Sequence, residues 1–355
     1  MRIVHISIPV HVDYLQNSCV IGKKNHYTLN SFQYKPLILP QESTMLSLIT
    51  RQNILTLMGC ISFSMLSHSS LASPNLMEES FPDGTPILEC QNEIDGMACI
   101  PGGSLIRGTE EEHSCEQPEN RRYKTKFGPH GTVWVQTFYM DKTEVTYEAY
   151  QNCVKEKKCD RSKPAYSDFN RPKQPMMGMS WYKAKKFCEA QGKRLPTEAE
   201  WERAARGPNS DRTPFGNIEV TCDQAVIKDK SGRSCGVKRK GSTPLTGRVW
   251  EVGKKPAGHF GLYDMVGNAE EWVADWYTAS IEDCGEECQG INPKGICSGA
   301  SKCKKSKKKI VKGGSWYWPN THATGWHRRP HFPINKPYHH FGFRCASSLK
   351  PDQSK

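Results

Sequence analysis

The chain lacks an apolar run long enough to cross a bilayer as a helix. Its clearest apolar run, Ile54–Leu66, has 13 residues, whereas a spanning helix needs about 20. No fixed-period repeat is present, so a solenoid or propeller is not expected. The cysteines do not follow a repeated zinc-ligand spacing, which argues against a zinc-stabilised fold.

Acidic residues are too few to balance the basic ones. The chain has 37 Asp and Glu against 49 Lys and Arg, a net charge of +12, which raises nucleic acid as a partner. Six of these lysines, however, fall in the single stretch Lys302–Lys309. The sequence contains no groove-reading helix and no platform for base stacking, so nucleic acid is not an expected partner.

Cysteine and the loop-forming residues are abundant. Fifteen cysteines are unusual for a reduced cytosolic enzyme and typical of an oxidising compartment. The 29 Gly and 23 Pro indicate a loop-rich architecture rather than a helical bundle.

The apolar run has the length of a signal-peptide core. Arg51 precedes it, and Ser70-Leu71-Ala72 places small residues where a signal peptidase reads the chain. We therefore expect residues 1–72 to be a targeting segment, with Met45 as the start and 1–44 as a misassigned extension. The protein would then be periplasmic or secreted. The alternative is a lipoprotein anchored at Cys60, which follows Leu57-Met58-Gly59.

The rest of the chain divides into a linker and one domain. Residues 73–96 are polar and punctuated by Pro and Gly, as expected of a linker. The domain is expected at 97–350, beginning with a short strand and glycine turn in 97–109 and a second alternating run in 133–146. A Cys- and Lys-rich insertion occupies 281–309, after which Ile310 resumes the core.

Three helices are predicted from their capping residues. Thr146 can cap a helix that runs to about Glu156. Ser180 can cap a second helix with an apolar stripe, which Gly192 ends. Thr197 and Glu200 form a capping box for a third helix, which stops at Gly207-Pro208.

Four sequence blocks occur in a fixed order. They are MDKTEVTYEAY (140–150), MSWYKAKKFCEAQGKRLPTEAEWERAARG (179–207), FGLYDMVGNAEEWVADWY (260–277), and VKGGSW (311–316) with GFRC (342–345). Their order and wording closely resemble the sulfatase-modifying-factor family, which includes the formylglycine-generating enzyme. The resemblance covers about 97–348. It implies a single α+β domain of formylglycine-generating-enzyme fold, C-type-lectin-like and loop-rich, with little regular secondary structure and disulfide staples.

The resemblance also implies a structural disulfide between Cys188 and Cys345. Local pairs are expected among the other cysteines, namely Cys90 with Cys99, Cys153 with Cys159, and Cys222 with Cys235. Two bridges are expected among Cys284, Cys288, Cys297 and Cys303, with three connectivities open. Cys115 is left over.

Four positions match a calcium site of the family. They are Asp264, Gly267, Ala269 and Glu271, which would offer two carboxylates and two backbone carbonyls. Oxygen ligands of this kind suit a hard cation, so calcium is the expected metal. The alternative is local structure, because Asn268 and Glu271 also have capping-box spacing and Asp264 could close a turn.

The family's oxidases use two cysteines after the Gly-Gly-Ser motif. These cysteines bind copper and convert a substrate cysteine to formylglycine. Counting from Gly313-Gly314-Ser315, the matching positions here are Trp318 and Ala323, neither of which can coordinate a metal. We therefore assign no catalytic residues and do not expect copper.

Aromatic and imidazole groups fill this region instead. Trp316, Trp318, Trp326, His327 and Arg328 are candidates for a pocket that takes a peptide or sugar; a buried aromatic core is the alternative. Five histidines could offer nitrogen ligands to a metal, although their spacing follows no ligand rule; they are His322, His327, His331, His339 and His340.

The lysine stretch of the insertion has two interpretations. Lys302–Lys309 could be a solvated loop without function. It could also hold an anionic polymer or membrane headgroups outside the cytoplasm.

The sequence therefore predicts an exported binding or accessory protein on this scaffold. Its partner would be an unidentified protein, peptide or glycan. The alternative is a diverged oxidase that acts on a protein cysteine or on a small molecule.

Overall fold

A computed structural model describes most of the chain after residue 79. The described residues are 20–22, 80–91, 94–109, 112–116, 122–125, 131–164, 166–240, 247–279, 282–334 and 339–348. The apolar run at 54–66, Cys60 and the cleavage point at Ala72 lie outside them. None of the helices in this described part is both long and apolar enough to cross a membrane.

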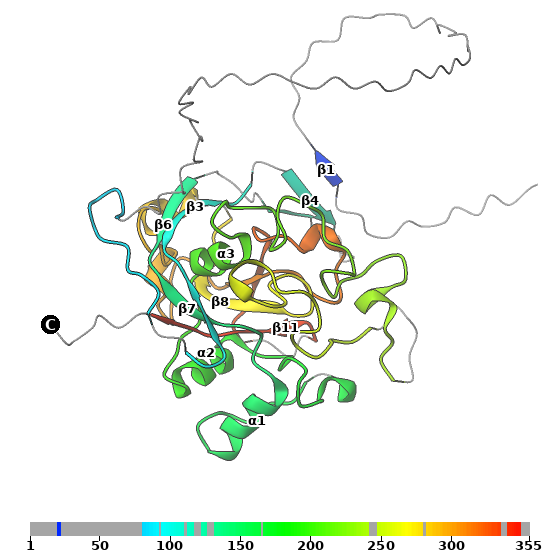
Figure 1. The fold of residues 1–355 in the computed structure, drawn as a ribbon. Coiled ribbons are helices and arrows are strands. Elements are labelled where there is room, and N and C mark those ends of the chain that lie inside the picture. Colours follow the sequence, from blue (N-terminus) through cyan, green and yellow to red (C-terminus); the bar gives the residue numbers. More distant parts are fainter. Residues whose placement is uncertain are drawn as a thin grey trace, which may run out of the picture. The chain divides into compact units, whose positions relative to one another are not determined.

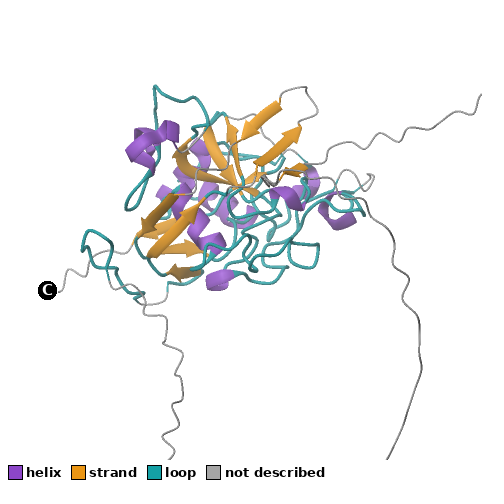
Figure 2. Ribbon diagram, turned by 90° about the horizontal axis from the view of Figure 1, so that it is seen from above, coloured by secondary structure: helices purple, strands orange, loops and turns teal. Residues whose placement is uncertain are grey.

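Short helices and strands are joined by long loops (Figure 2), as expected for this loop-rich sequence. The α-helices are α1 (Tyr147–Lys155), α2 (Trp181–Ala190) and α3 (Glu198–Arg206). The 3-10 helices are η1 (Ser167–Phe169), η2 (Arg233–Gly236), η4 (His259–Gly261), η5 (Glu282–Cys288), η6 (Ile296–Gly299) and η7 (Asn320–His322). This mixed architecture confirms the predicted α+β class.

The strands form four small sheets. The described strands have the orders β10-β9-β8-β11 in a four-stranded sheet, β12-β7-β2 and β1-β4-β5 in two three-stranded sheets, and β3-β6 in a two-stranded sheet. The strand bounds are β1 (Val20–Gly22), β2 (Met97–Ile100), β3 (Gly103–Arg107), β4 (Glu112–Glu116), β5 (Arg122–Thr125), β6 (Gly131–Val135), β7 (Phe138–Asp141), β8 (Glu270–Trp276), β9 (Lys309–Lys312), β10 (Arg328–His331), β11 (Phe341–Gly342) and β12 (Ala346–Ser348).

The three α-helices begin at the predicted capping residues. The side chain of Thr146 accepts a hydrogen bond from the Ala149 amide at 3.1 Å, and that of Ser180 accepts one from the Lys183 amide at 3.3 Å. Both bonds of the predicted capping box are present at the start of α3. Each hydroxyl satisfies an amide that the first helical turn leaves without a partner.

The two alternating runs of the sequence are each broken in the middle. The breaks face each other, where the Gly102 amide donates to Thr137 Oγ1 at 2.8 Å. Before and after this point the strands pair in different sheets, β2 with β7 and β3 with β6. Pro101 has no amide to donate to a ladder, which favours the break on the first strand.

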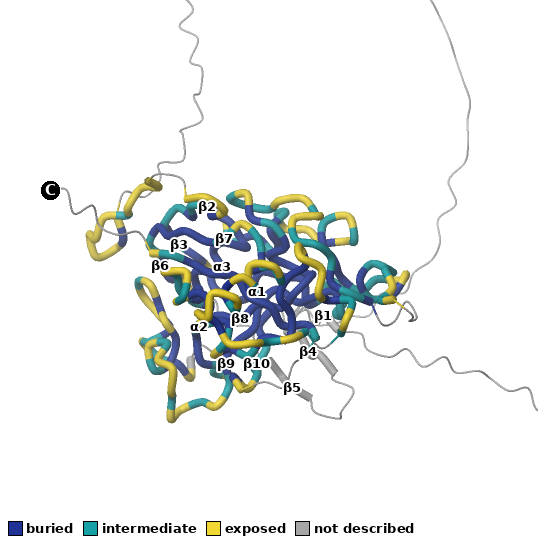
Figure 3. The backbone as a smooth tube through the Cα atoms, turned by 90° about the horizontal axis from the view of Figure 1, so that it is seen from below, coloured by how far each residue is buried: buried dark blue, intermediate teal, exposed yellow. Residues whose placement is uncertain are grey.

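Helix α3 lies at the centre of the domain. All nine of its residues are buried, and it packs against β3, β6, β8 and β9. In Figure 1, α2 lies on the other side of β8. The buried backbone gathers around these elements and the exposed backbone lies in the outer loops (Figure 3). The side chains beneath α3 are therefore shielded from water.

Part of the expected linker is hydrogen-bonded to the domain. The Gln136 amide group donates to the Pro86 carbonyl at 3.0 Å and its oxygen accepts from the Leu88 amide at 2.8 Å. Phe81 is only 2% exposed. Residues 81–88 are thus attached to the β6–β7 connection.

Six disulfides staple the described part of the chain. Cys188 on α2 and Cys345 before β12 are joined with their Cα atoms 5.6 Å apart, as the resemblance implies. The other pairs are Cys90–Cys99, Cys153–Cys159, Cys222–Cys235, Cys284–Cys288 and Cys297–Cys303. The insertion cysteines thus pair with their sequence neighbours. The side chain of Cys115 lies outside the description. This many disulfides indicates an oxidising environment.

Candidate functional site

The Gly-Gly-Ser turn after β9 is held against the loop that precedes β8. Gly313 and Gly314 have φ angles of +87° and +67°, which side-chain-bearing residues rarely adopt. A Cβ on Gly313 would lie 2.8 Å from the Met265 carbonyl oxygen. The turn is fixed by two backbone bonds, from Gly267 to Gly313 and from Trp316 to Asn268, both 3.0 Å. The fixed turn therefore determines the direction in which the chain continues from Trp316 onward.

An aromatic–histidine cluster follows this turn. It consists of Tyr166, Trp316, Tyr317, Trp318, His322, His339 and His340. Trp318 stacks on His322 with ring centroids 5.0 Å apart and planes 12° from parallel. Trp316 is buried, whereas Tyr166, Tyr317 and Trp318 are half-buried. One end of the cluster, at Trp316, is therefore part of the core, and the other end presents partly accessible aromatic rings to solvent.

Guanidinium groups lie on the outer rings of this cluster. Arg233 is centred 3.5 Å from the Tyr317 ring and Arg239 3.8 Å from the Tyr166 ring. Burial, followed by these two cations, lowers the pKa of His339 to about 4. Burial also lowers the pKa of His340, and the Arg329 guanidinium is the largest cationic contribution. Both imidazoles are therefore neutral near pH 7.

A buried carboxylate anchors the inner side of the cluster. Arg329 donates to both oxygens of Glu270, at 2.8 and 2.9 Å, and its guanidinium lies 4.7 Å from the Trp318 ring. Burial raises the pKa of Glu270, although Arg329 opposes that rise. Arg329 thus fixes Trp318 from β10 by a charge-assisted pair.

The two positions that the resemblance assigns to the copper cysteines lie here. Trp318 belongs to the ring surface, and Ala323 is 1% exposed in the core beside Val266 and Ile227. Every cysteine whose side chain the structure describes is part of a disulfide. A pair of thiolates for copper(I) is therefore missing from the described residues.

The five histidines are only partly brought together. His322 and His327 have ring centroids 4.6 Å apart, and His339 and His340 4.9 Å apart, while His331 lies against Phe341. Within the described ranges, no three His, Cys, Asp or Glu side chains are grouped so as to hold a metal ion.

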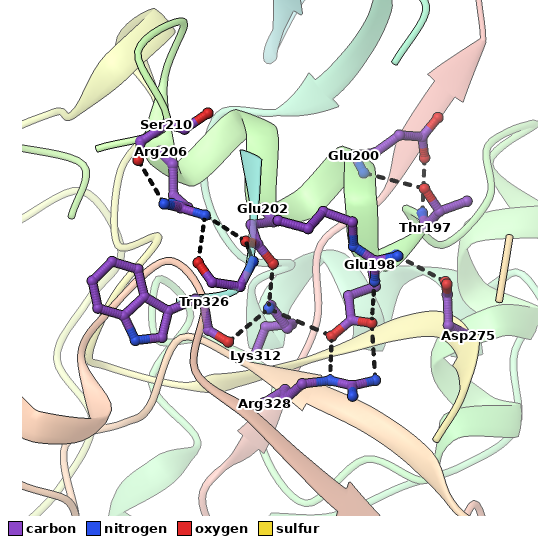
Figure 4. A network of polar contacts seen from close by, with 12 residues as sticks. Thr197, Glu198, Glu200, Glu202, Arg206, Ser210, Asp275, Lys312, Trp326 and Arg328 are labelled. Carbon is purple, nitrogen blue, oxygen red and sulfur yellow. Dashed lines mark hydrogen bonds and ion pairs between the residues drawn. The ribbon is translucent and has the colours of Figure 1, made fainter. Parts of the chain in front are cut away.

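Two further residues of the predicted pocket lie at a buried ion network beneath α3 (Figure 4). Arg328 donates to Glu198 at 2.7 Å, and the Trp326 carbonyl accepts from Lys312 at 3.3 Å. Arg328 is 5% exposed and Trp326 is 6% exposed. These side chains support the core of the domain, whereas Trp316 and Trp318 belong to the cluster.

Glu198 is the centre of this network. Besides Arg328, it contacts Arg107 at 2.7 Å and Lys312 at 3.5 Å. Burial disfavours its charge, but the three cations outweigh burial and lower its pKa to about 2. Glu202, one turn further along α3, binds Lys312 at 3.1 Å and Arg206 at 2.7 Å. Glu198 is therefore ionised throughout the physiological pH range.

The predicted calcium ligands lie in a second buried group. β8 begins at Glu270, so the helix-cap alternative for Asn268 and Glu271 is wrong. Both oxygens of Glu271 already accept from Arg344, at 2.7 and 2.8 Å. The Asp264 carboxylate, 6% exposed, accepts from the Gly253 amide at 2.7 Å.

Glu144 joins this group and was missed in the sequence. Its Oε1 accepts from the side-chain Nδ2 of Asn268 at 3.1 Å, while Oε2 is buried with no hydrogen-bond partner. Burial and the nearby Asp264 carboxylate raise its pKa well above its usual range. Because Arg344 occupies Glu271, the side chains left to offer oxygen to a hard cation are the two carboxylates of Glu144 and Asp264, to which backbone carbonyls would have to be added.

A cleft of about 610 Å³ opens elsewhere in the domain. It lies between the attached segment at Leu88, the β6–β7 connection, α2 and the insertion. The predicted pocket residues are absent from its lining, which is formed by Leu88, Gln136, Thr137, Phe138, Trp181, Lys185, Glu189, Arg194, Leu195, Thr197, Glu200, Ala274, Asn292, Lys294, Ser298, Gly299 and Ser348.

Sequence reasoning missed the cations of the cluster. Arg233 and Arg239 come from a stretch with no block motif, so no spacing pointed to them. Glu144 and Glu198, in contrast, lie inside the quoted motifs DKTEVT and RLPTEAEWE. Each is an acidic residue that follows a Thr and precedes an apolar residue inside a motif block, and this was a signal that could have been used.

Comparison with known proteins agrees with this geometry. Residues 84–349 match the sulfatase-modifying factor enzyme 1-like domain. The chain is 34% identical over 191 residues to the formylglycine-generating enzyme of Bos taurus, covering 53% of this chain and 48% of the bovine protein. It is 27% identical over 279 residues to the serine/threonine-protein kinase pkn1 of Chlamydia caviae, covering 72% of this chain and 38% of that protein. The chain thus spans about half, or less, of these relatives.

The fold has a solved counterpart. The structure of PvdO from Pseudomonas aeruginosa superposes with a TM-score of 0.51 at 23% identity, covering 71% of this chain and 94% of that one. At this identity the match concerns the fold alone. Because the domain family matches three quarters of the sequence, this chain belongs to the family of proteins with a sulfatase-modifying factor enzyme 1-like domain.

Proposed function

We propose that this protein is an exported, non-catalytic binding or accessory member of its family. The observation that carries the proposal is the pair of residues at the copper positions. Trp318 packs against His322 and Ala323 is buried in apolar surroundings, so neither a thiolate nor space for a metal-bound substrate is expected there.

The proposed ligand is a segment of a protein, a peptide or a glycan that lies on the outer rings of the aromatic–histidine cluster. Half-buried Tyr317 and Trp318 offer flat faces for stacking. Arg233 lies on the Tyr317 ring and makes no ion pair with any residue in the described part, so it is available to an anionic group of the ligand. Neutral His339 adds hydrogen bonding without further positive charge.

Calcium is the proposed structural ion of the loop before β8. The carboxylates of Glu144 and Asp264, with backbone carbonyls near Gly267, would hold it. A bound divalent cation would neutralise buried charge and stabilise the loop that fixes the Gly-Gly-Ser turn. It would supply no redox chemistry.

The diverged oxidase is separated from this proposal by a turnover experiment. The full chain is purified under oxidising conditions, and its copper, iron and calcium contents are measured. Oxygen uptake is then followed with a cysteine-containing sulfatase peptide, with Cu(I) supplied. We expect no uptake and no aldehyde in the peptide by mass spectrometry. Formylglycine in the peptide would overturn the non-catalytic assignment.

The position of the ligand site is tested with arrays of peptides and glycans. Trp318→Ala should abolish the array signals of the wild-type protein, and Arg233→Gln should weaken those of anionic probes. Lys294→Gln, which changes the separate cleft, is the matched control and should leave the signals unchanged. Loss in the control but not in the cluster variants would move the site to the cleft.

A further inference from the structure

The lysine-rich end of the insertion and the loop after β10 together form a basic and apolar face. Its lysines are Lys302, Lys304, Lys305 and Lys307, all exposed. Its apolar side chains are Phe332 and Ile334, exposed by 55% and 81%, the two most exposed large apolar residues in the described part of the chain. We call this the insertion face.

Strand pairing brings the two kinds of residue together. β9 and β10 are antiparallel, with Lys309 opposite His331, so Lys308 and Phe332 continue the two strands side by side. The Lys308 ammonium lies 5.4 Å from the centre of the Phe332 ring. The lysine stretch thus reaches the apolar tip at Lys308 and Phe332.

The loop that carries Phe332 and Ile334 is held in place. The backbone carbonyl of Pro333, between them, accepts from the Trp181 amide at the start of α2 at 3.1 Å. Tyr182, 40% exposed, donates from α2 to the Ser301 carbonyl of the insertion at 3.5 Å. Helix α2 therefore fixes both parts of the face, and its apolar tip stays turned toward solvent.

The lysine stretch of this face is of one sign, whereas the start of the insertion carries the exposed acidic residues Asp283 and Glu286. No Asp or Glu occurs in the sequence between Glu287 and Asp352. Lys305 pairs with Glu287 at 3.3 Å, whereas Lys302, Lys304 and Lys307 form no ion pair with any described residue. Exposed lysines this close in the sequence repel one another. Binding an anionic partner would relieve this repulsion and so be favourable.

We propose that the insertion face binds the surface of an anionic lipid bilayer. Phe332 and Ile334 would enter the interface between headgroups and acyl chains, while the lysines contact anionic headgroups from their long stems. A polyanion in water offers no apolar region for the exposed tip. Protein interfaces are depleted in lysine, which disfavours a protein partner on this face.

Flotation with lipid vesicles tests the proposal on the full chain. Vesicles of phosphatidylcholine with phosphatidylglycerol should retain the protein, and pure phosphatidylcholine should not. Each lysine near an anionic surface is worth about fivefold in binding. The charge-reversed variant Lys302→Glu/Lys304→Glu/Lys307→Glu should therefore bind at least on the order of 100-fold more weakly.

The control for charge is Lys142→Glu/Lys157→Glu/Lys254→Glu. These three lysines are also exposed, so the control has the same net charge but an intact insertion face. It should bind nearly as the wild type does. An equal loss in both triple variants would overturn the proposal, because attraction would then follow net charge alone.

A second variant tests the apolar tip. Phe332→Ser/Ile334→Ser keeps all charges and should weaken vesicle binding by roughly 10- to 100-fold per residue buried, with Ile218→Ser, 46% exposed at another site, as its control. The loss should persist at high salt, which screens the lysines but not apolar burial. Unchanged binding of this variant would overturn the proposal that the face binds a bilayer, and would indicate instead that the lysines alone adsorb to any polyanion.

Discussion

Replacing Glu198 with Gln should lower the free energy of unfolding by about 3 kcal/mol at pH 7. The pKa of Glu198 is about 2 in the folded protein, against an ordinary value of 4.5, and each tenfold change in proton affinity is worth about 1.4 kcal/mol. Because the carboxylate is buried among Arg328, Lys312 and Arg107, solvent screens it little. Gln is isosteric but neutral, and it leaves these cations with less compensation.

The same substitution should change how stability depends on pH. A carboxyl group with a lowered folded pKa contributes stability above pH 4.5, and this contribution is lost as pH falls toward 2. The difference between wild type and Glu198→Gln should therefore be full at pH 7 and less than half of that by pH 3. Urea unfolding at several pH values measures it.

A matched control uses a carboxylate at the surface. Glu219 is 62% exposed and lies 4.0 Å from Arg212, so Glu219→Gln should cost less than about 0.5 kcal/mol at any pH. Equal losses in the two variants, or a Glu198→Gln loss that does not vary with pH, would refute the reasoning that the buried cations hold Glu198 ionised.

Two further predictions concern the staples and the ion. Replacing Cys188 and Cys345 with Ala opens a loop of 157 residues and should cost about 5 kcal/mol in the chain-entropy model. Removing Cys284–Cys288, separated by 4 residues, should cost only about 2 kcal/mol; equal losses on urea unfolding would contradict this ranking. Calcium at 100 times its Kd should stabilise the protein by about 2.7 kcal/mol, whereas Glu144→Gln should respond little. A melting temperature of the wild type that does not change when calcium is added would count against the site.

The sequence predicted those features of the fold that depend on local chemistry. Thr146, Ser180 and Thr197 begin the three helices because a hydroxyl at the cap satisfies nearby amides. The fold family followed from the motif blocks, and the pairings of Cys153 and Cys222 followed from short spacing. The caps and these disulfides each depend on residues within 13 positions of one another.

Apart from the Cys188–Cys345 disulfide, which the family resemblance implies, contacts between residues far apart in the chain were not predicted. Glu198 meets Arg107 and Arg328, which are 91 and 130 positions away, and no spacing rule joins them. Strand β8 lies within the motif block 260–277 and was not predicted as a strand. It is buried on both faces, and such a strand shows no alternation of apolar and polar residues. Arg233 reaches the candidate site from η2, in a stretch that contains none of the motif blocks.

The position of β12 has a consequence for how the protein is made. β7 lies between β2, near the start of the domain, and β12, close to its end. A chain emerging from the ribosome or an export channel cannot complete this sheet until residue 348 has appeared. Before the last residues emerge, Glu271 lacks its partner Arg344. The Cys188 thiol likewise has no Cys345 with which to form its disulfide. Loss of the last dozen described residues should therefore leave an unfolded, mispairing chain rather than a shortened domain.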